Sequence, residues 1–247
     1  NYNLSNKYFL NTSLRYEGSS KFGENNKWGL FPSVSVGWNI SKESFMEDIT
    51  LLSLLKLRAG FGVTGTVPSA SYTSLSRLSY GGKYFYNGQW ISVIQPSSNA
   101  NPDLRWETKE EINIGVDFGF LKDRITGAID IYKRNTKDLL WEYKVPMPPY
   151  LFPSVLANAG SMENKGIEIQ INANIIKGPN FEWNTNLNFS TNKNKVISLS
   201  NKDFKLEGGF FYTGSTGEPI QSTTHIVREG EALGNFWGYK SVGIDDN

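Results

Sequence analysis

The sequence has no cysteine, a single histidine and almost no excess of charge, since 25 Lys and Arg residues stand against 24 Asp and Glu in 247 residues. The lack of cysteine excludes a disulfide framework, zinc fingers, iron–sulfur clusters and thiol catalysis. His225, being the one histidine, excludes multi-histidine metal sites and leaves little for a Ser/His/Asp triad. With a net charge of only +1, the protein lacks the strongly basic surface that sequence-independent nucleic-acid binding needs, so we expect no nucleic-acid partner.

Long hydrophobic runs are also missing. No apolar stretch approaches the roughly 18–20 residues of a transmembrane helix, so any membrane-crossing segment must be a strand. Neither a starting Met nor an apolar signal segment opens the chain at Asn1, and we expect the sequence to be a fragment. What the sequence does contain is 24 Gly, 14% aromatic residues and many Asn, Ser and Thr residues, a composition typical of strands joined by polar loops.

Apolar and polar residues alternate strictly in seven segments. In the segment 167–175, for example, isoleucines at 167, 169 and 171 alternate with polar residues at 168, 170 and 172. The seven predicted strands are residues 8–17, 28–40, 55–63, 106–120, 125–131, 167–175 and 183–189, with a weaker eighth around 236–244. Most are longer than the roughly 5–6 residues of globular strands, and match the ~9–11 residues that a tilted strand needs to cross a bilayer.

The predicted connections alternate between long and short. We expect tight turns at 121–124 and 176–180, and long polar loops at 64–103, at 135–164 and from 192 onward. Long loops at one end and short turns at the other are typical of an outer-membrane barrel, although the 41–54 link is longer than that pattern expects. Tyr8 with Tyr16, and Trp28 with Trp38, are spaced to lie about 20–25 Å apart, as two interfacial aromatic girdles would.

Five motifs run in order along most of the chain. They are LRAGFGVTG at 57–65, NPDLRWET at 101–108 with NIGVDF at 113–118, DIYKRNTKDLL at 130–140, NAG and ENKGIE between 158 and 168, and GEALGNFWGY at 230–239. Together they resemble the barrel of SusC/RagA-type TonB-dependent outer-membrane transporters. The resemblance implies an all-β fold, with residues 1–247 forming one partial barrel domain of seven or eight strands out of roughly 22.

The same resemblance implies the function and the partners. It places the sequence in the C-terminal half of the barrel, and we expect the plug domain, the signal peptide and the TonB-interacting segment to be absent from it. The implied protein imports oligosaccharides or peptides across the outer membrane of a Gram-negative bacterium. It is energised by the TonB complex, works with a SusD-like surface lipoprotein, contacts outer-membrane lipid, and needs no cofactor and no metal.

Two motifs have alternative interpretations in terms of chemistry. Residues 60–65 match G-x-G-x-x-G, but a dinucleotide site needs a helix directly afterwards, and Pro68 follows in a polar run instead. Glycines on a barrel strand explain the match better. Several carboxylates on the polar faces would suit a glycosidase acid and base, yet basic residues share those faces, so a charge-balanced lumen is the favoured interpretation. These carboxylates are Glu107, Glu111, Asp117, Asp130 and Glu168.

Aromatic residues in the long loops are the candidate ligand contacts, because aromatic faces stack on sugars and on peptide side chains. The alternative is that they pack loop against loop or against a protein partner. The candidates are Tyr84, Tyr86, Trp90, Trp141, Tyr143, Phe211 and Tyr212. Asp245, Asp246 and Asn247 match the start of a calcium-binding loop without supplying its remaining ligands.

Two other classes of protein remain open at this point. A soluble β-sandwich carbohydrate-binding module would explain the aromatic residues and the polar loops, but neither the length of the alternating segments nor the ordered motifs. A secreted glycosidase fragment would use the carboxylates as catalytic groups. We therefore expect a transporter barrel without enzymatic activity.

Overall fold

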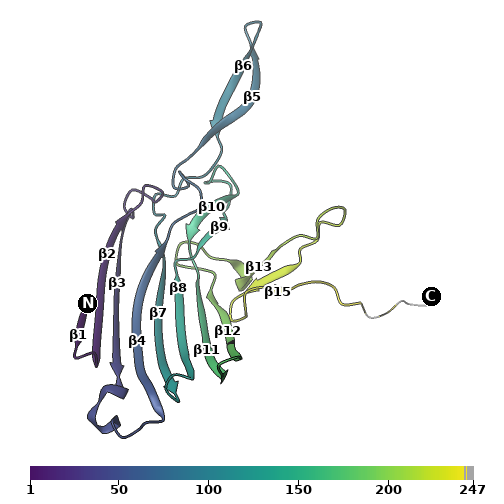
Figure 1. The fold of residues 1–247 in the computed structure, drawn as a ribbon. Coiled ribbons are helices and arrows are strands. Elements are labelled where there is room, and N and C mark those ends of the chain that lie inside the picture. The colour runs from purple at the N-terminus through teal and green to yellow at the C-terminus, as the bar shows by residue number, and fades with distance from the viewer. Residues whose placement is uncertain (242, 244–247) are drawn as a thin grey trace.

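The long strands form one antiparallel sheet of eight, in the order β1-β2-β3-β4-β7-β8-β11-β12 (Figure 1). The structure is a computed structural model and describes residues 1–241 and residue 243. The strands of this sheet are β1 Tyr2–Leu4, β2 Tyr8–Gly18, β3 Trp28–Asn39, β4 Leu52–Thr66, β7 Glu107–Phe120, β8 Ile125–Lys137, β11 Ser161–Lys177 and β12 Glu182–Ser198. Neighbours in the sheet follow the chain order, as in an up-and-down barrel wall.

All seven predicted strands are present in this sheet. Their lengths run from 11 residues in β2 to 17 residues in β11 and β12, so each is long enough to cross a bilayer when tilted. The eighth member is the short edge strand β1, which three residues of sequence could not reveal by alternation. The weak strand expected around 236–244 is reduced to the two residues of β15 outside this sheet, and residues 242 and 244 lie outside the described part of the chain.

The connections divide the sheet into a turn end and a loop end (Figure 1). The turn end carries the links 40–51, 121–124 and 178–181, and the loop end carries residues 19–27, 67–106, 138–160 and 199–241. Short elements at the loop end are the hairpins β5 Leu78–Tyr86 with β6 Gln89–Pro96 and β9 Leu140–Lys144 with β10 Ser154–Asn158, the strands β13 Phe210–Thr213, β14 His225–Arg228 and β15 Asn235–Phe236, and the 3₁₀ turn η3 Glu207–Gly209.

The unexpectedly long link at the turn end has a structural explanation. It contains two 3₁₀ turns, η1 Ile40–Lys42 and η2 Ser44–Met46. Between them, Glu43 accepts hydrogen bonds from the Tyr8 hydroxyl at 2.7 Å and from the Trp38 indole at 3.0 Å, and pairs with Lys7 at 3.1 Å. These interactions, the Tyr8 bond foremost, lower the pKa of Glu43 to about 2. The link therefore supplies the hydrogen-bond acceptor for the polar groups of Tyr8 and Trp38, two of the predicted girdle residues.

The two faces of the sheet differ in character, as the alternation predicts. The outer face, defined as the one carrying Ile114, exposes apolar side chains, with Ile114 57% and Leu14 70% accessible. On this face Tyr8 lies directly opposite Trp38 near the turn end, and Tyr16 stacks on Trp28 with ring centroids 4.9 Å apart near the loop end. The predicted pairs of aromatic residues thus lie at the two ends of the apolar band.

The buried apolar residues lie at the loop end rather than behind the sheet. Three clusters form there: Phe22, Phe31, Leu104 and Trp106; then Tyr143, Val155, Ala157 and Ala159; then Val196, Leu199 and Val227. A β-sandwich would cover one face of its long strands with a second sheet. The other sheets among the described residues have only two or three strands, so the β-sandwich alternative is wrong. No helix in the described part of the chain is long and apolar enough to cross a bilayer.

Candidate functional site

The inner face, defined as the one carrying Arg58, is a polar wall with balanced charges. Arg58 on β4 donates from Nε to both carboxylate oxygens of Asp117 on β7, at 3.0 and 2.9 Å, and from Nη2 to Asp130 on β8 at 3.0 Å. The guanidinium thereby links three neighbouring strands. Gly115 makes room for it, because a Cβ on Gly115 would lie 2.7 Å from Arg58 Nη2.

Two of the three other candidate carboxylates on the inner face are engaged in a similar way. Glu111 pairs with Arg134 at 2.6 Å, and Glu107 lies 3.7 Å from Lys109 while accepting a hydrogen bond from the Leu140 amide at 3.2 Å. Glu168, on β11, has no ion pair among the described residues. Four of the five carboxylates considered for glycosidase chemistry thus contact cations along the wall, in agreement with the balance of charges that the sequence favoured.

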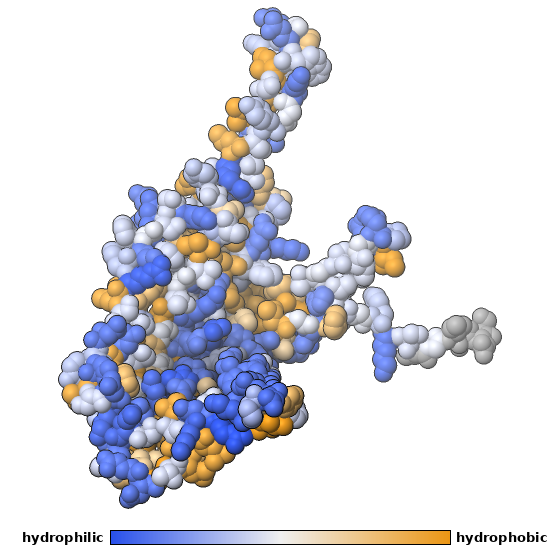
Figure 2. All heavy atoms as spheres, viewed as in Figure 1, coloured by the Kyte–Doolittle hydropathy of each residue, from blue (hydrophilic) through white to orange (hydrophobic). Residues whose placement is uncertain are grey.

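Beyond Arg58 the inner face becomes a surface of amides. Asn188 donates to Asn186 at 2.5 Å, Asn186 in turn donates to Asn172 across the strand pair, and Asn174 donates to Glu182 at 3.0 Å. These residues lie on β11 and β12, and Figure 2 shows hydrophilic residues gathered over the lower ends of these strands. Side-chain amides both donate and accept hydrogen bonds, so this surface can pair with hydroxyl groups and with peptide groups alike.

A glycine in the ENKGIE motif shapes the same wall. Tyr132 lies directly opposite Gly166, and its hydroxyl accepts a hydrogen bond from Asn192 at 2.9 Å. The ring reaches Asn192 by crossing Gly166, where a Cβ would come within 2.7 Å of the Tyr132 hydroxyl. The motif glycine therefore allows an aromatic residue to lie flat over a neighbouring strand.

At the loop end, the NPDLRWET motif holds the loops together. Trp106 packs on Phe22 and Phe31 with ring centroids 4.7 and 5.1 Å apart. Gly65, the last glycine of the G-x-G-x-x-G match, has no room for a side chain because a Cβ would lie 2.6 Å from the Trp106 ring. Gly65 thus serves close packing on a strand, whereas Gly60 and Gly62 leave room for a Cβ, 3.6 Å from its nearest neighbour at each position.

Asparagines join the same motif to the segment around Asn158. Asn101 donates to the Leu156 carbonyl at 2.8 Å, and Asn158 exchanges hydrogen bonds with the backbone of Arg105, accepting at 2.8 Å and donating at 2.7 Å. Asn201 donates to the Asn158 carbonyl at 2.8 Å and ties in the third loop. The three loops therefore form one block, which we call the asparagine-clamped block.

The hairpin β5–β6 projects away from this block (Figure 1) and carries three of the candidate ligand contacts. Tyr84 and Tyr86 lie on one face of the hairpin with ring centroids 6.3 Å apart, and both are exposed. Trp90 lies on the opposite face, directly across from Phe85. The structure thus divides the three aromatic residues between two surfaces of the same hairpin.

The remaining candidates lie on β9 and β13, which the structure brings together. Trp141 packs on Phe211 with ring centroids 4.3 Å apart, although the two residues belong to different loops. Tyr212 packs on Trp237, 5.0 Å away, and 43% of its surface is accessible. Trp237 was not among the predicted contacts, because only the fold places it beside β13.

Tyr143 lies inside the asparagine-clamped block, 5% exposed. Its hydroxyl donates to the Leu199 carbonyl at 2.6 Å, and its ring packs on Phe204. Burial raises the pKa of Tyr143 to about 12, with a smaller contribution from the Glu229 carboxylate. In this position the side chain supports the loops and does not reach a ligand at the surface.

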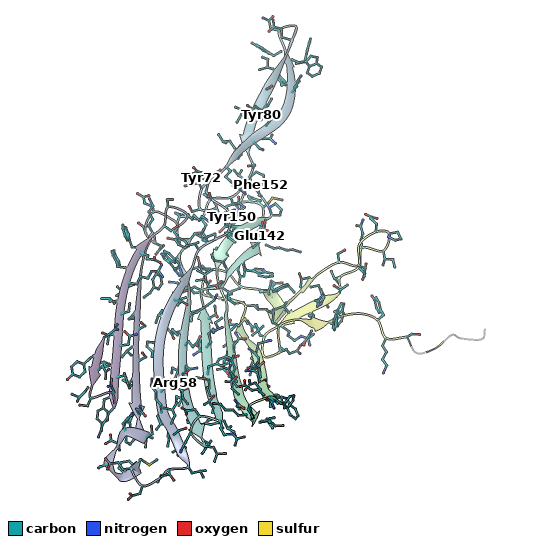
Figure 3. All side chains as sticks on the ribbon, in the orientation of Figure 1. Arg58, Tyr72, Tyr80, Glu142, Tyr150 and Phe152 are labelled. Atoms are coloured by element: carbon teal, nitrogen blue, oxygen red, sulfur yellow. The ribbon has the colours of Figure 1, made fainter. Side chains whose placement is uncertain are left out.

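A hollow of about 400 Å³ lies between the base of the β5–β6 hairpin and the β9–β10 hairpin. It is lined by Arg77, Asn99, Glu142 and Phe152, and Figure 3 places Glu142 and Phe152 beneath the hairpin. Asn99 fixes its shape by donating to the carbonyls of Phe152 and Ser154 at 2.7 and 2.8 Å. Sequence reasoning missed this hollow because its lining comes from two loops far apart in the chain.

The described residues contain no group of three or more His, Asp or Glu side chains placed to hold a metal ion. The calcium loop considered at Asp245–Asn247 lies outside the described part of the chain.

A polar inner wall, an apolar outer band and loops gathered at one end agree with the family comparison. The family model described as "TonB dependent receptor-like, beta-barrel" matches residues 1–240. The chain belongs to this family. Barrels of TonB-dependent receptors are outer-membrane proteins, and the family comprises receptors and transporters.

Named relatives and solved structures support this membership in the TonB-dependent receptors. TonB-dependent receptor P39 of Formosa agariphila is 38% identical over 98% of this chain and 22% of its own length. TonB-dependent receptor SusC of Bacteroides thetaiotaomicron is 36% identical over 100% of this chain and 25% of its own length. The RagAB peptide importer in the closed-closed state superposes with a TM-score of 0.77 at 26% identity, over 91% of this chain and 23% of that one.

The chain therefore spans about a quarter of the length of the TonB-dependent receptors that it matches. Eight strands do not close a barrel of this class, which has roughly 22. The sheet is one section of such a wall.

Proposed function

We propose that these residues form a section of the barrel wall of an active importer in the outer membrane of a Gram-negative bacterium, which takes up oligosaccharides or peptides. The family match over residues 1–240 is the observation that carries the proposal. We further propose that the remaining strands and the plug domain lie elsewhere in the whole protein, and that TonB supplies the energy through those parts.

The inner wall supports passage of a polar substrate. It combines the amide surface of β11 and β12 with ion pairs such as Arg58–Asp117 and Glu111–Arg134, so no large field of one sign opposes a neutral substrate. A sugar or a peptide exchanges hydrogen bonds with such a wall at many equivalent positions. Four of the five carboxylates considered for catalysis contact cations along it, and we propose that the chain has no enzymatic activity.

The loop end is the proposed contact region for substrate and for a SusD-like surface lipoprotein. The hairpin β5–β6 extends beyond the asparagine-clamped block with Tyr84, Tyr86 and Trp90 exposed, where a partner that covers the barrel would meet it. Trp141, Phe211 and Tyr212 form a second aromatic surface beside β13. We propose these six residues as contacts, with Tyr143 supporting them from inside the block.

The test uses the full-length transporter purified in detergent from outer membranes together with any lipoprotein that accompanies it. A mixture of maltooligosaccharides and a tryptic peptide digest are offered separately, and the retained species are identified by mass spectrometry. The double variant Tyr84→Ser/Tyr86→Ser should retain at least tenfold less of the bound class, or should lose the lipoprotein.

Phe181→Ser is the matched control, because Phe181 is exposed to the same degree, 62% against 59% for Tyr84, but lies at the turn end. It should leave both retention and lipoprotein unchanged. In whole cells, a protonophore should stop uptake. Recovery of the protein without detergent, or uptake that continues without a proton gradient, would contradict the proposal of an energised importer.

A further inference from the structure

Three lysines lie side by side on the outer face of the sheet. Lys133 on β8 is directly opposite Lys165 on β11, and Lys165 is directly opposite Lys193 on β12. All three are exposed, with 53% of the Lys133 side chain and 57% of the Lys165 side chain accessible. We call this set the lysine row.

The lysine row borders the apolar band on the side nearer the loops. One step toward the turn end, the same strands present Ile131 opposite Ile167, and the next step presents Ile129 opposite Ile169. Further along β12, Phe189 and Leu187 continue the apolar surface. Because the long loops mark the extracellular end, the lysines lie at the height of the headgroups of the outer leaflet.

The lysine row carries more positive charge than the neighbouring acidic residues neutralise. Glu163 lies 2.7 Å from Lys133 and 3.7 Å from Lys165, so one carboxylate serves two lysines. Lys195, opposite Glu163, adds a further cation one step above Lys193, and neither Lys193 nor Lys195 forms an ion pair within the described residues. Like charges directly opposite one another destabilise a sheet, so this arrangement favours an added anion.

We propose that the lysine row binds the anionic phosphate of a lipid headgroup in the outer leaflet. The phosphate meets the lysine ammonium groups, and the acyl chains lie along the apolar surface of Ile131, Ile167 and Phe189 below them. A free phosphate ion would gain the charge contacts alone. A lipid gains both kinds of contact, and the outward direction of the row places it against the bilayer rather than against the loops.

The experiment measures lipid bound to the full-length transporter by native mass spectrometry in detergent. The probes are diphosphorylated lipid A, the same lipid with its phosphates removed, and inorganic phosphate. Wild-type protein should retain the phosphorylated lipid, and the variant Lys133→Gln/Lys165→Gln/Lys193→Gln should bind it at least tenfold more weakly. Raising the salt concentration should weaken the wild-type complex and affect the variant much less.

The control variant Lys83→Gln/Lys144→Gln/Lys202→Gln removes the same charge from the loop end and should bind like wild type. Thermal unfolding confirms that both variants are folded. Equal binding by the two variants, or equal binding of the lipid without phosphates, would overturn the proposal. Competition by inorganic phosphate at concentrations similar to those of the lipid would assign the row to free phosphate instead and would equally overturn it.

Discussion

We expect a substitution by arginine to lower stability much more on the outer face of β3 than on its inner face. Val34 lies on the outer face, opposite Thr12 and Phe61, and Ser33 lies on the inner face, opposite Ser13 and Gly62. Arginine at position 34 must place its guanidinium in lipid, whereas arginine at position 33 extends into a hollow of about 280 Å³ on the inner face. The two sites are adjacent in the chain and in the same strand, so backbone effects are closely matched.

The expected cost follows from depth in the bilayer. With a rise of about 3.3 Å per residue and a tilt near 40°, each residue advances about 2.5 Å along the membrane normal. Val34 is then about 10 Å from the Trp38 girdle, close to the centre of a band about 25 Å tall, and Val36 is about 5 Å from the girdle. We expect Val34→Arg to cost ~2–4 kcal/mol, Val36→Arg less, and Ser33→Arg about 0–1 kcal/mol.

The assay is equilibrium unfolding of the full-length protein in lipid vesicles, followed by tryptophan fluorescence and by heat-modifiable mobility on gels. The free energy of unfolding should be highest for wild type and should fall in the order Ser33→Arg, Val36→Arg, Val34→Arg. If Ser33→Arg cost as much as Val34→Arg, the assignment of the two faces would be refuted. If Val36→Arg cost more than Val34→Arg, the position of the lower girdle at Trp38 would be wrong.

Two further predictions concern the inner wall and the turn end. Gly115→Ala should separate Arg58 from Asp130 and lower the free energy of unfolding by about 1–3 kcal/mol in urea titrations. Gly60→Ala should lower it clearly less, because the new Cβ would lie 3.6 Å from its nearest neighbour. Equal losses for the two variants would contradict this account. The folded-state pKa of Glu43, about 2, lies below its ordinary value of 4.5. Its contribution to stability is therefore present above pH 4.5 and is lost as the pH falls toward 2. Glu43→Gln should remove that part of the acid dependence, and an unchanged profile between pH 5 and pH 2 would count against the interaction.

The sheet was predictable because one physical rule governs the whole of it. A strand between lipid and water must alternate apolar and polar residues, so the alternation in the sequence predicts β11 and β12. The balanced charges of the wall followed from the same reasoning, since Arg58 and Asp117 share a face. The ends of these strands were less predictable, because above the bilayer the outer face becomes polar and alternation no longer marks it.

The loops were predictable in position but not in arrangement. Aromatic composition indicated recognition surfaces, yet Tyr143 turned out buried and Trp237 joined Tyr212 from a distant segment. The hollow beside Glu142 depends on Asn99 clamping a loop more than fifty positions away. Contacts of this kind depend on how loops fold back on one another, and no periodic pattern in the sequence encodes them.

The separation between the asparagine-clamped block and the β5–β6 hairpin has an evolutionary consequence. The block is fixed by buried packing around Trp106 and around Tyr143, so most changes within it would disturb more than one loop at once. The hairpin shares none of that packing and leaves the block through two chain segments, joined where Ser97 donates from both its backbone amide and its hydroxyl to the Arg77 carbonyl. Insertions, deletions or exchanges of the hairpin therefore leave the scaffold intact. Related proteins can diversify in what they meet outside the cell while keeping the same wall in the membrane.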